Sequence, residues 1–127
     1  MIFYSRIIHF LLLTFLSSQV FGQNLPVLID LAKQQKWEEL SSLLRDGLNP
    51  NVIYGDGTTA LHWASYHDNK NAADVLLSVG ADVNATTDLG VTPLWLAAEN
   101  GNVNIVTTLL SAGADPTIQL LSGESPV

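Results

Sequence analysis

Beyond Gly22, few side chains of this chain are suited to catalysis. Only His62 and His67 offer an imidazole there, and the 127 residues include no cysteine to act as a thiol nucleophile or a thiolate ligand. The two histidines are five positions apart, which places them on different faces of a helix. Asp68 beside His67 offers a weak metal contact, but no third ligand completes a site. We therefore expect no catalytic residue, no metal site and no cofactor.

A serine near the C-terminus lies in a sequence close to a nucleophile elbow, the glycine-x-serine-x-glycine pattern of many hydrolases. Val127 stands where the second glycine belongs, and no strand–turn–helix pattern surrounds Ser125. Residues 123–127 also follow residues 90–94 by 33 positions, so we interpret them as the truncated start of a further repeated unit. No glycine-rich phosphate-binding loop is present. A hydrolase or a metal enzyme is therefore the least favoured class.

Residues 1–22 have the three parts of a secretory signal peptide. Arg6 gives a positive start, an apolar stretch runs from residue 7 to 16, and a polar tail closes on the small residue Gly22. The uncharged run from Ile7 to Gly22 is shorter than the roughly 20 residues that cross a bilayer as a helix. We expect cleavage after Gly22, a new N-terminus at Gln23, and a periplasmic or secreted product. The alternative is an uncleaved leader that anchors the chain to a membrane.

The charge of the remaining chain narrows the class of partner. Without residues 1–22 it keeps 4 of its 5 Lys and Arg residues and all 12 Asp and Glu residues, a net charge of −8. Nucleic acids and anionic lipids both need a basic surface. We therefore expect a protein partner, no nucleic acid, and no stable membrane insertion once the leader is cleaved.

The chain also repeats itself at a fixed offset of 33 positions, which is typical of stacked repeat proteins. Thr92-Pro93 predicts a helix start, with threonine as the N-cap and proline at the first helical position. Gly101 and Gly113 suit the left-handed ends of two successive helices. The polar segment 84–91 between units suits a hairpin-like finger. Each unit is therefore expected to be a pair of helices followed by a finger.

These motifs resemble the ankyrin repeat. GTTALHWAS at 57–65 and GVTPLWLAA at 90–98 are similar to the pattern that opens an ankyrin unit. LLSVGADVN at 76–84 and LLSAGAD at 109–115 are similar to the pattern that closes it. The resemblance covers roughly residues 25–127 and implies an all-α solenoid of about three stacked helix-turn-helix units with fingers, plus the start of a fourth.

The chain departs from the family pattern at several positions. Ala60 replaces the proline that follows the N-cap threonine, and Trp95 replaces a histidine whose hydrogen bonds tie neighbouring units. His62 keeps that histidine, so the resemblance implies a structural role for it, while the same tie is in question at Trp95. Asp68 stands where a helix-ending glycine belongs, although aspartate tolerates the left-handed region better than most residues.

The first unit keeps only the apolar skeleton of a repeat, as expected of a terminal cap with one face in water. We divide the chain into a signal peptide (1–22), a degenerate capping unit (23–57), two repeats (58–90 and 91–122) and the truncated start of another (123–127). No C-terminal cap follows. We therefore expect an uncovered apolar face that includes Leu94, Ile105 and Leu109, with marginal stability or self-association, unless the natural protein continues past Val127.

In the family, partners bind the finger tips and the concave first helices. Trp63 and Trp95 lie on such helices, where core packing and partner contact are equally open, whereas Trp37 begins the second helix of the cap and suits packing. Asn84-Ala85-Thr86 matches a glycosylation acceptor, but Asn84 is also the family's turn asparagine, and we favour that role. By position, the candidate partner-binding residues are Ile53, Gly55, Asp56, Thr58, Trp63, Tyr66, His67, Thr86, Asp88, Leu89, Val91, Glu99 and Asn100.

Together these patterns predict an exported, non-catalytic protein–protein interaction module. The mixture of aromatic, apolar and acidic groups at the candidate positions suits a protein surface. A membrane-anchored scaffold with an uncleaved leader is the alternative. The sequence of the mature N-terminus would separate the two.

Overall fold

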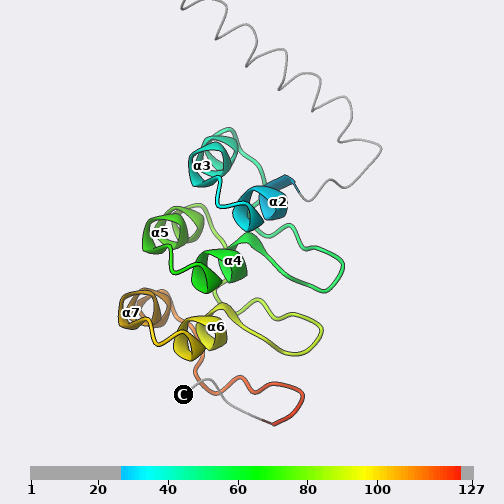
Figure 1. Cartoon of the computed structure of the whole chain (residues 1–127), viewed down its shortest axis with the longest axis vertical. Coiled ribbons are helices and arrows are strands. Elements are labelled where there is room, and N and C mark those ends of the chain that lie inside the picture. Colours follow the sequence, from blue (N-terminus) through cyan, green and yellow to red (C-terminus); the bar gives the residue numbers. More distant parts are fainter. Residues whose placement is uncertain (1–26, 124–127) are drawn as a thin grey trace, which may run out of the picture.

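The structure, a computed structural model, describes residues 27–123, which form three stacked helix pairs (Figure 1). The predicted signal peptide (residues 1–22) and residues 124–127 of the predicted truncated repeat lie outside the described residues. The described part of the chain contains no strand, which confirms the all-α repeat solenoid. The pairs are α2 (Val27–Lys33) with α3 (Trp37–Arg45), α4 (Ala60–Tyr66) with α5 (Lys70–Ser78), and α6 (Pro93–Glu99) with α7 (Val103–Ser111).

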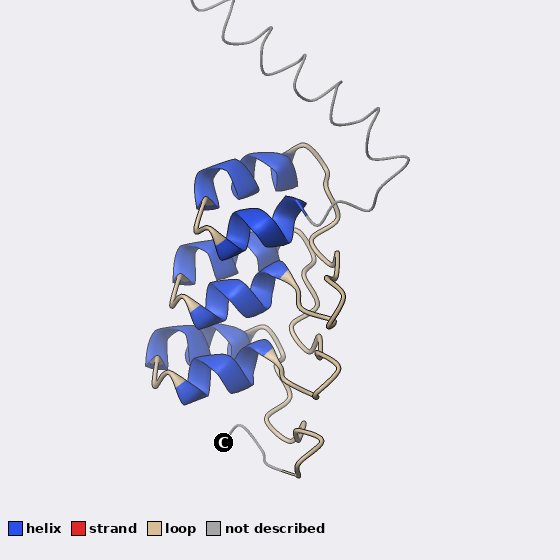
Figure 2. Cartoon of the chain, turned by 45° about the vertical axis from the view of Figure 1, so that its right-hand side comes forward, coloured by secondary structure: helices blue, strands red, loops and turns tan. Residues whose placement is uncertain are grey.

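The first helices α2, α4 and α6 form one layer, and the second helices α3, α5 and α7 form the other (Figure 1). Three loops project from the stack on one side, beside the layer of first helices (Figure 2). We call them the first finger (residues 46–59), the second finger (79–92) and the third finger (112–123). The first helices and the fingers therefore share one continuous surface.

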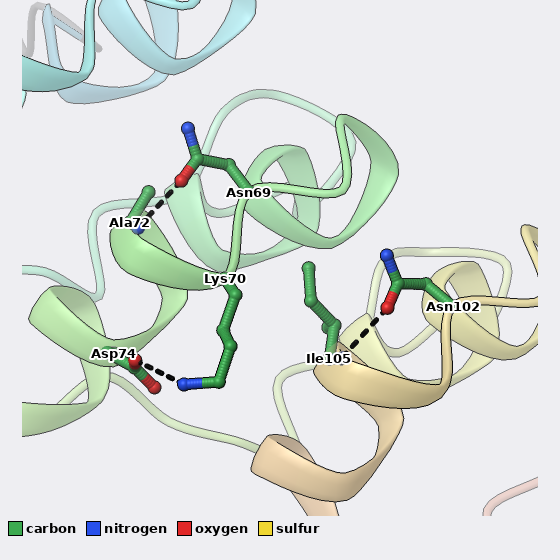
Figure 3. Close-up of polar contacts among 6 residues, drawn as sticks. All are labelled: Asn69, Lys70, Ala72, Asp74, Asn102 and Ile105. Atoms are coloured by element: carbon green, nitrogen blue, oxygen red, sulfur yellow. Dashed lines mark hydrogen bonds and ion pairs between the residues drawn. The ribbon is translucent and has the colours of Figure 1, made fainter.

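Equivalent residues cap equivalent helices. The Asn69 side chain accepts a hydrogen bond from the Ala72 N–H at 2.9 Å, and in the next unit Asn102 accepts one from Ile105 at 3.1 Å (Figure 3). Such a cap satisfies one of the backbone donors left free at a helix start. Thr92 caps α6 in the same way, and Pro93 occupies its first turn, as predicted.

The turn between the two helices of each unit uses a left-handed residue at the same position of the repeat. Gln35, Asp68 and Gly101 have φ values of +58°, +59° and +71°, so the prediction for Asp68 is confirmed. Only glycine adopts this region without a steric cost. The first two turns therefore keep their shape with residues that are strained there.

The core runs along the stack as columns of equivalent residues. Leu28, Leu61 and Leu94 are each almost fully buried at successive steps of the repeat. Small residues such as Ala64 and Ala97 are completely buried between the first helices and allow them to approach closely. Burial of these columns, rather than the short helices themselves, provides most of the stability.

The prediction of which residues form an uncovered apolar face was wrong. Leu94, Ile105 and Leu109 are at most 1% exposed, because they face the interior between α6, α7 and the preceding unit. The repeat register identifies a residue that does lack cover. Leu110 is 44% exposed, whereas its equivalent Leu44 in the first unit is only 3% exposed.

The fingers are fixed by two asparagines, one in each of the first two. The Asn84 side chain donates to the Gly113 carbonyl at 3.3 Å and accepts from the Asp115 N–H at 2.8 Å. Asn51 makes the equivalent pair of bonds to Gly80 and Asp82, one unit earlier. The structural role favoured for Asn84 is therefore confirmed, and its side-chain amide is engaged at both ends.

Close stacking of the fingers also requires glycine. A Cβ atom on Gly57, whose φ is +83°, would lie 3.1 Å from the Thr86 carbonyl oxygen of the next finger. The Asp88 N–H donates to the Asp56 carbonyl at 2.8 Å and joins the two finger tips. Neighbouring fingers therefore form a continuous wall beside the first helices.

Candidate binding surface

The imidazole of His62 joins the second and third units. Its Nδ1 accepts a hydrogen bond from the Thr59 N–H at 3.1 Å, and its Nε2 lies 2.9 Å from the Val91 carbonyl oxygen. This pattern requires the proton on Nε2, which donates to Val91. The side chain is 1% exposed, and burial lowers the pKa of His62 against the opposing effect of the Val91 bond. The structural role implied by the resemblance is confirmed.

The corresponding position in the third unit is Trp95. A tie equivalent to that between His62 and Val91 would reach residue 124, which lies outside the described residues. The Trp95 N–H donates to the Thr92 hydroxyl at 3.1 Å and so takes part in the cap of α6.

A groove of about 360 Å³ lies between the first two fingers and the first helices α4 and α6. Side chains of the fingers form its wall, and side chains of the helices form its floor. The residues that line it are Asp56, Thr58, His62, Trp63, Tyr66, Thr87, Asp88, Leu89, Val91 and Leu96.

Some of the predicted partner-binding residues line the groove. The predicted residues that line it are Asp56, Thr58, Trp63, Tyr66, Asp88, Leu89 and Val91. The predicted residues that do not line it are Ile53, Gly55, His67, Thr86, Glu99 and Asn100. Among the latter, the Asn100 side chain donates to the Tyr66 carbonyl at 2.9 Å and links the ends of α6 and α4.

Three lining residues were not among the predicted contacts: His62, which was given a structural role instead, Thr87 and Leu96. Leu96 follows Trp63 by 33 positions, so the repeat register itself places both on the same face of their helices. Thr87 follows Tyr54, an exposed finger residue, by the same step. Transferring the predicted contact at Trp63 to the next unit would have found Leu96, whereas Tyr54 was not among the predicted contacts and gave no such signal for Thr87.

An aromatic cluster holds the floor of the groove in place. Trp63 packs edge-on against Tyr66 at 5.7 Å between ring centroids and stacks on His67 at the same distance. Trp37 contacts His67 edge-on from the first unit. Trp63 also packs against the hydrophobic core. It therefore combines the two roles that were left open, core packing and a place on the candidate surface.

The rim of the groove is acidic. Asp56 accepts a hydrogen bond from the Thr58 N–H at 2.9 Å, and bonds from the Thr58 side chain and backbone lower the pKa of Asp56. Asp88 is exposed on the neighbouring finger tip. Outside the residues that line the groove, the Lys33 ammonium lies 5.6 Å from the centre of the Trp63 ring. The groove thus has an apolar floor and a carboxylate rim, with one cation beside Trp63.

Within residues 27–123, no group of three or more His, Asp or Glu side chains is arranged to hold a metal ion. No helix in the described part of the chain is long and apolar enough to cross a membrane.

Comparisons with known proteins agree with this architecture. Residues 28–119 match a family model described as ankyrin repeats in three copies. The chain is also 51% identical over 41 residues to the Ankyrin repeat and LEM domain-containing protein 1 homolog of Caenorhabditis elegans. That alignment covers 32% of this chain and 6% of the relative. The chain therefore belongs to the ankyrin repeat family, whose repeats indicate a protein–protein interaction module.

Proposed function

We propose that this chain is an exported, non-catalytic module that binds a protein partner through its finger tips and first helices. The groove between α4, α6 and the first two fingers is the observation that supports this proposal. Its apolar floor meets a polar, acidic rim, which is the usual anatomy of a protein interface.

Two side chains of the groove are suited to anchor a partner. Tyr66 is 53% exposed and Leu89 is 69% exposed, although both are large and apolar. The Tyr66 ring is held by its contacts with Trp63 and His67, so little conformational freedom is lost when a partner binds. Anchors of this kind carry most of the binding energy in many interfaces.

The experiment that tests the binding site replaces both anchors. A pull-down from the exported fraction identifies the partner, and calorimetry then compares the wild type with Tyr66→Ala/Leu89→Ala. We expect affinity to fall at least about tenfold, because each anchor is worth roughly 1–2 kcal/mol. Val79→Ala/Val103→Ala removes two exposed apolar side chains outside the groove and serves as the control. Equal affinities for both double variants would refute this placement.

Export is a separate part of the proposal and has its own test. The three-part pattern of residues 1–22 supports it, and the uncharged run is short for a membrane anchor. N-terminal sequencing of the protein from the exported fraction should begin at Gln23. A chain that begins at Met1 and stays with the membrane would instead support the anchored scaffold.

A further inference from the structure

The chemistry of the groove narrows the kind of segment that binds there. Its volume of about 360 Å³ lies near the lower end of the roughly 300–1,000 Å³ range of ligand pockets. Such a space takes one or two side chains of a partner. Because Trp63, Leu89 and Leu96 surround it, the side chain that enters must be apolar.

The surface around the groove is acidic and therefore complements a basic partner. Asp56 and Asp88 stand on adjacent finger tips that are joined by a hydrogen bond of 2.8 Å between their backbones. From residue 46 to residue 123 the only Lys or Arg is Lys70. Lys70 is paired with Asp74 at 2.7 Å on α5, in the other layer of helices (Figure 3). No cation of the second or third unit therefore neutralises the rim.

Lys33 affects where a basic group of the partner can bind. Its ammonium lies 5.7 Å from the centre of the Tyr54 ring and 5.6 Å from that of Trp63. These distances are typical of cation–π contacts, so a positive charge already lies beside the Trp63 and Tyr54 rings. A basic group of the partner is repelled by Lys33 from these two rings and is attracted to the carboxylates of Asp56 and Asp88.

We propose that the groove binds a peptide segment in which a large apolar side chain lies one or two positions from an arginine or lysine. The apolar side chain enters between Trp63 and Leu89, and the cation meets the carboxylates of Asp56 and Asp88. This inference rests on the proposed function, since it names the partner chemistry of the same surface.

The probe that tests it is a library of random twelve-residue peptides displayed on phage. The library is selected on the full immobilised chain, after depletion on Tyr66→Ala/Leu89→Ala. We expect the selected peptides to share an apolar residue beside Arg or Lys. The affinity of a selected peptide is then measured for Asp56→Asn/Asp88→Asn. Glu38→Gln/Glu39→Gln is the control, because it removes the same charge from exposed positions of α3 outside the groove.

The loss of both rim carboxylates should weaken binding roughly tenfold at low salt, and high salt should reduce the difference. The control should change affinity less than twofold. If the selected peptides lack a basic residue, or if Asp56→Asn/Asp88→Asn binds as the wild type does, the partner chemistry is wrong while the binding site stands. If no peptide depends on Tyr66 and Leu89, the proposed function fails together with this inference.

Discussion

His62 Nε2 lies 2.9 Å from the carbonyl oxygen of Val91, so a side chain at the start of α4 holds the backbone that leads into α6. Val91 also lines the groove. The hydrogen bond that joins two units therefore also fixes one wall of the candidate surface. Stability and binding are coupled at this residue.

Replacing His62 by alanine should destabilise the fold strongly. The substitution removes a buried side chain and leaves the Thr59 N–H and the Val91 carbonyl without this partner. The expected loss is about 2–4 kcal/mol in the free energy of unfolding. Urea unfolding of the chain that starts at Gln23 measures it, with Tyr66→Ala as a control on an exposed residue of the same helix. A loss below about 0.5 kcal/mol would contradict a tie at this position.

The same histidine predicts a dependence of stability on pH. Burial lowers the pKa of His62 in the folded chain, so the unfolded chain binds more protons just below its ordinary pKa of about 6.5. The contribution of His62 to the free energy of unfolding is therefore fully present above about pH 6.5. It falls as the pH drops toward the folded pKa, by at most about 1.4 kcal/mol per pH unit. Urea midpoints at pH 7.5 and pH 5.5 measure the slope. His62→Gln should show a smaller slope over this range, and an equal slope would assign the effect to another group.

A glycine at the left-handed turn of the first unit should stabilise the protein. Gln35 has a φ of +58°, where a Cβ atom costs roughly 1–2 kcal/mol, and Gly101 occupies the equivalent turn of the third unit. Gln35→Gly should therefore raise the free energy of unfolding by about 1 kcal/mol. Gln35→Ala keeps the Cβ atom and serves as the control. If alanine stabilised the chain as much as glycine, backbone strain would not be the cause.

The fixed offset of the repeat predicted much of this architecture because each unit repeats its local signals. Thr92 and Pro93 mark a helix start, and Gly101 marks its end, from the chemistry of a few neighbouring residues. The same register predicted that Asp68 is left-handed. Such features depend on local sequence alone and can therefore be predicted from it. The structure confirms them.

Contacts between units were harder to predict. Periodicity shows that Leu109 is on an apolar face, but it does not show which neighbour covers that face. Leu96 was missed for a related reason, since a residue beside the buried Ala97 shows no polar or aromatic signal of its own. The cover of Leu109 depends on how one unit sits on the next, which a single unit's pattern does not contain, whereas Leu96 would have followed from carrying the Trp63 prediction 33 positions along the chain.

The expected self-association stays a prediction, now assigned to Leu110. This side chain is 44% exposed, while its equivalent Leu77 packs against the core. Exposed apolar surface on α7, the last helix of the described residues, favours contact with a second copy. Sedimentation of the chain that starts at Gln23 should show a mass that rises with concentration, and Leu110→Lys should abolish the rise. Val103→Lys is the matched control, because Val103 is exposed at the position that Lys70 occupies in the second unit. Because Lys70 is exposed there, that position needs no covering neighbour, and the lysine at 103 should leave association unchanged. A wild-type chain that stays monomeric at all concentrations would refute the prediction.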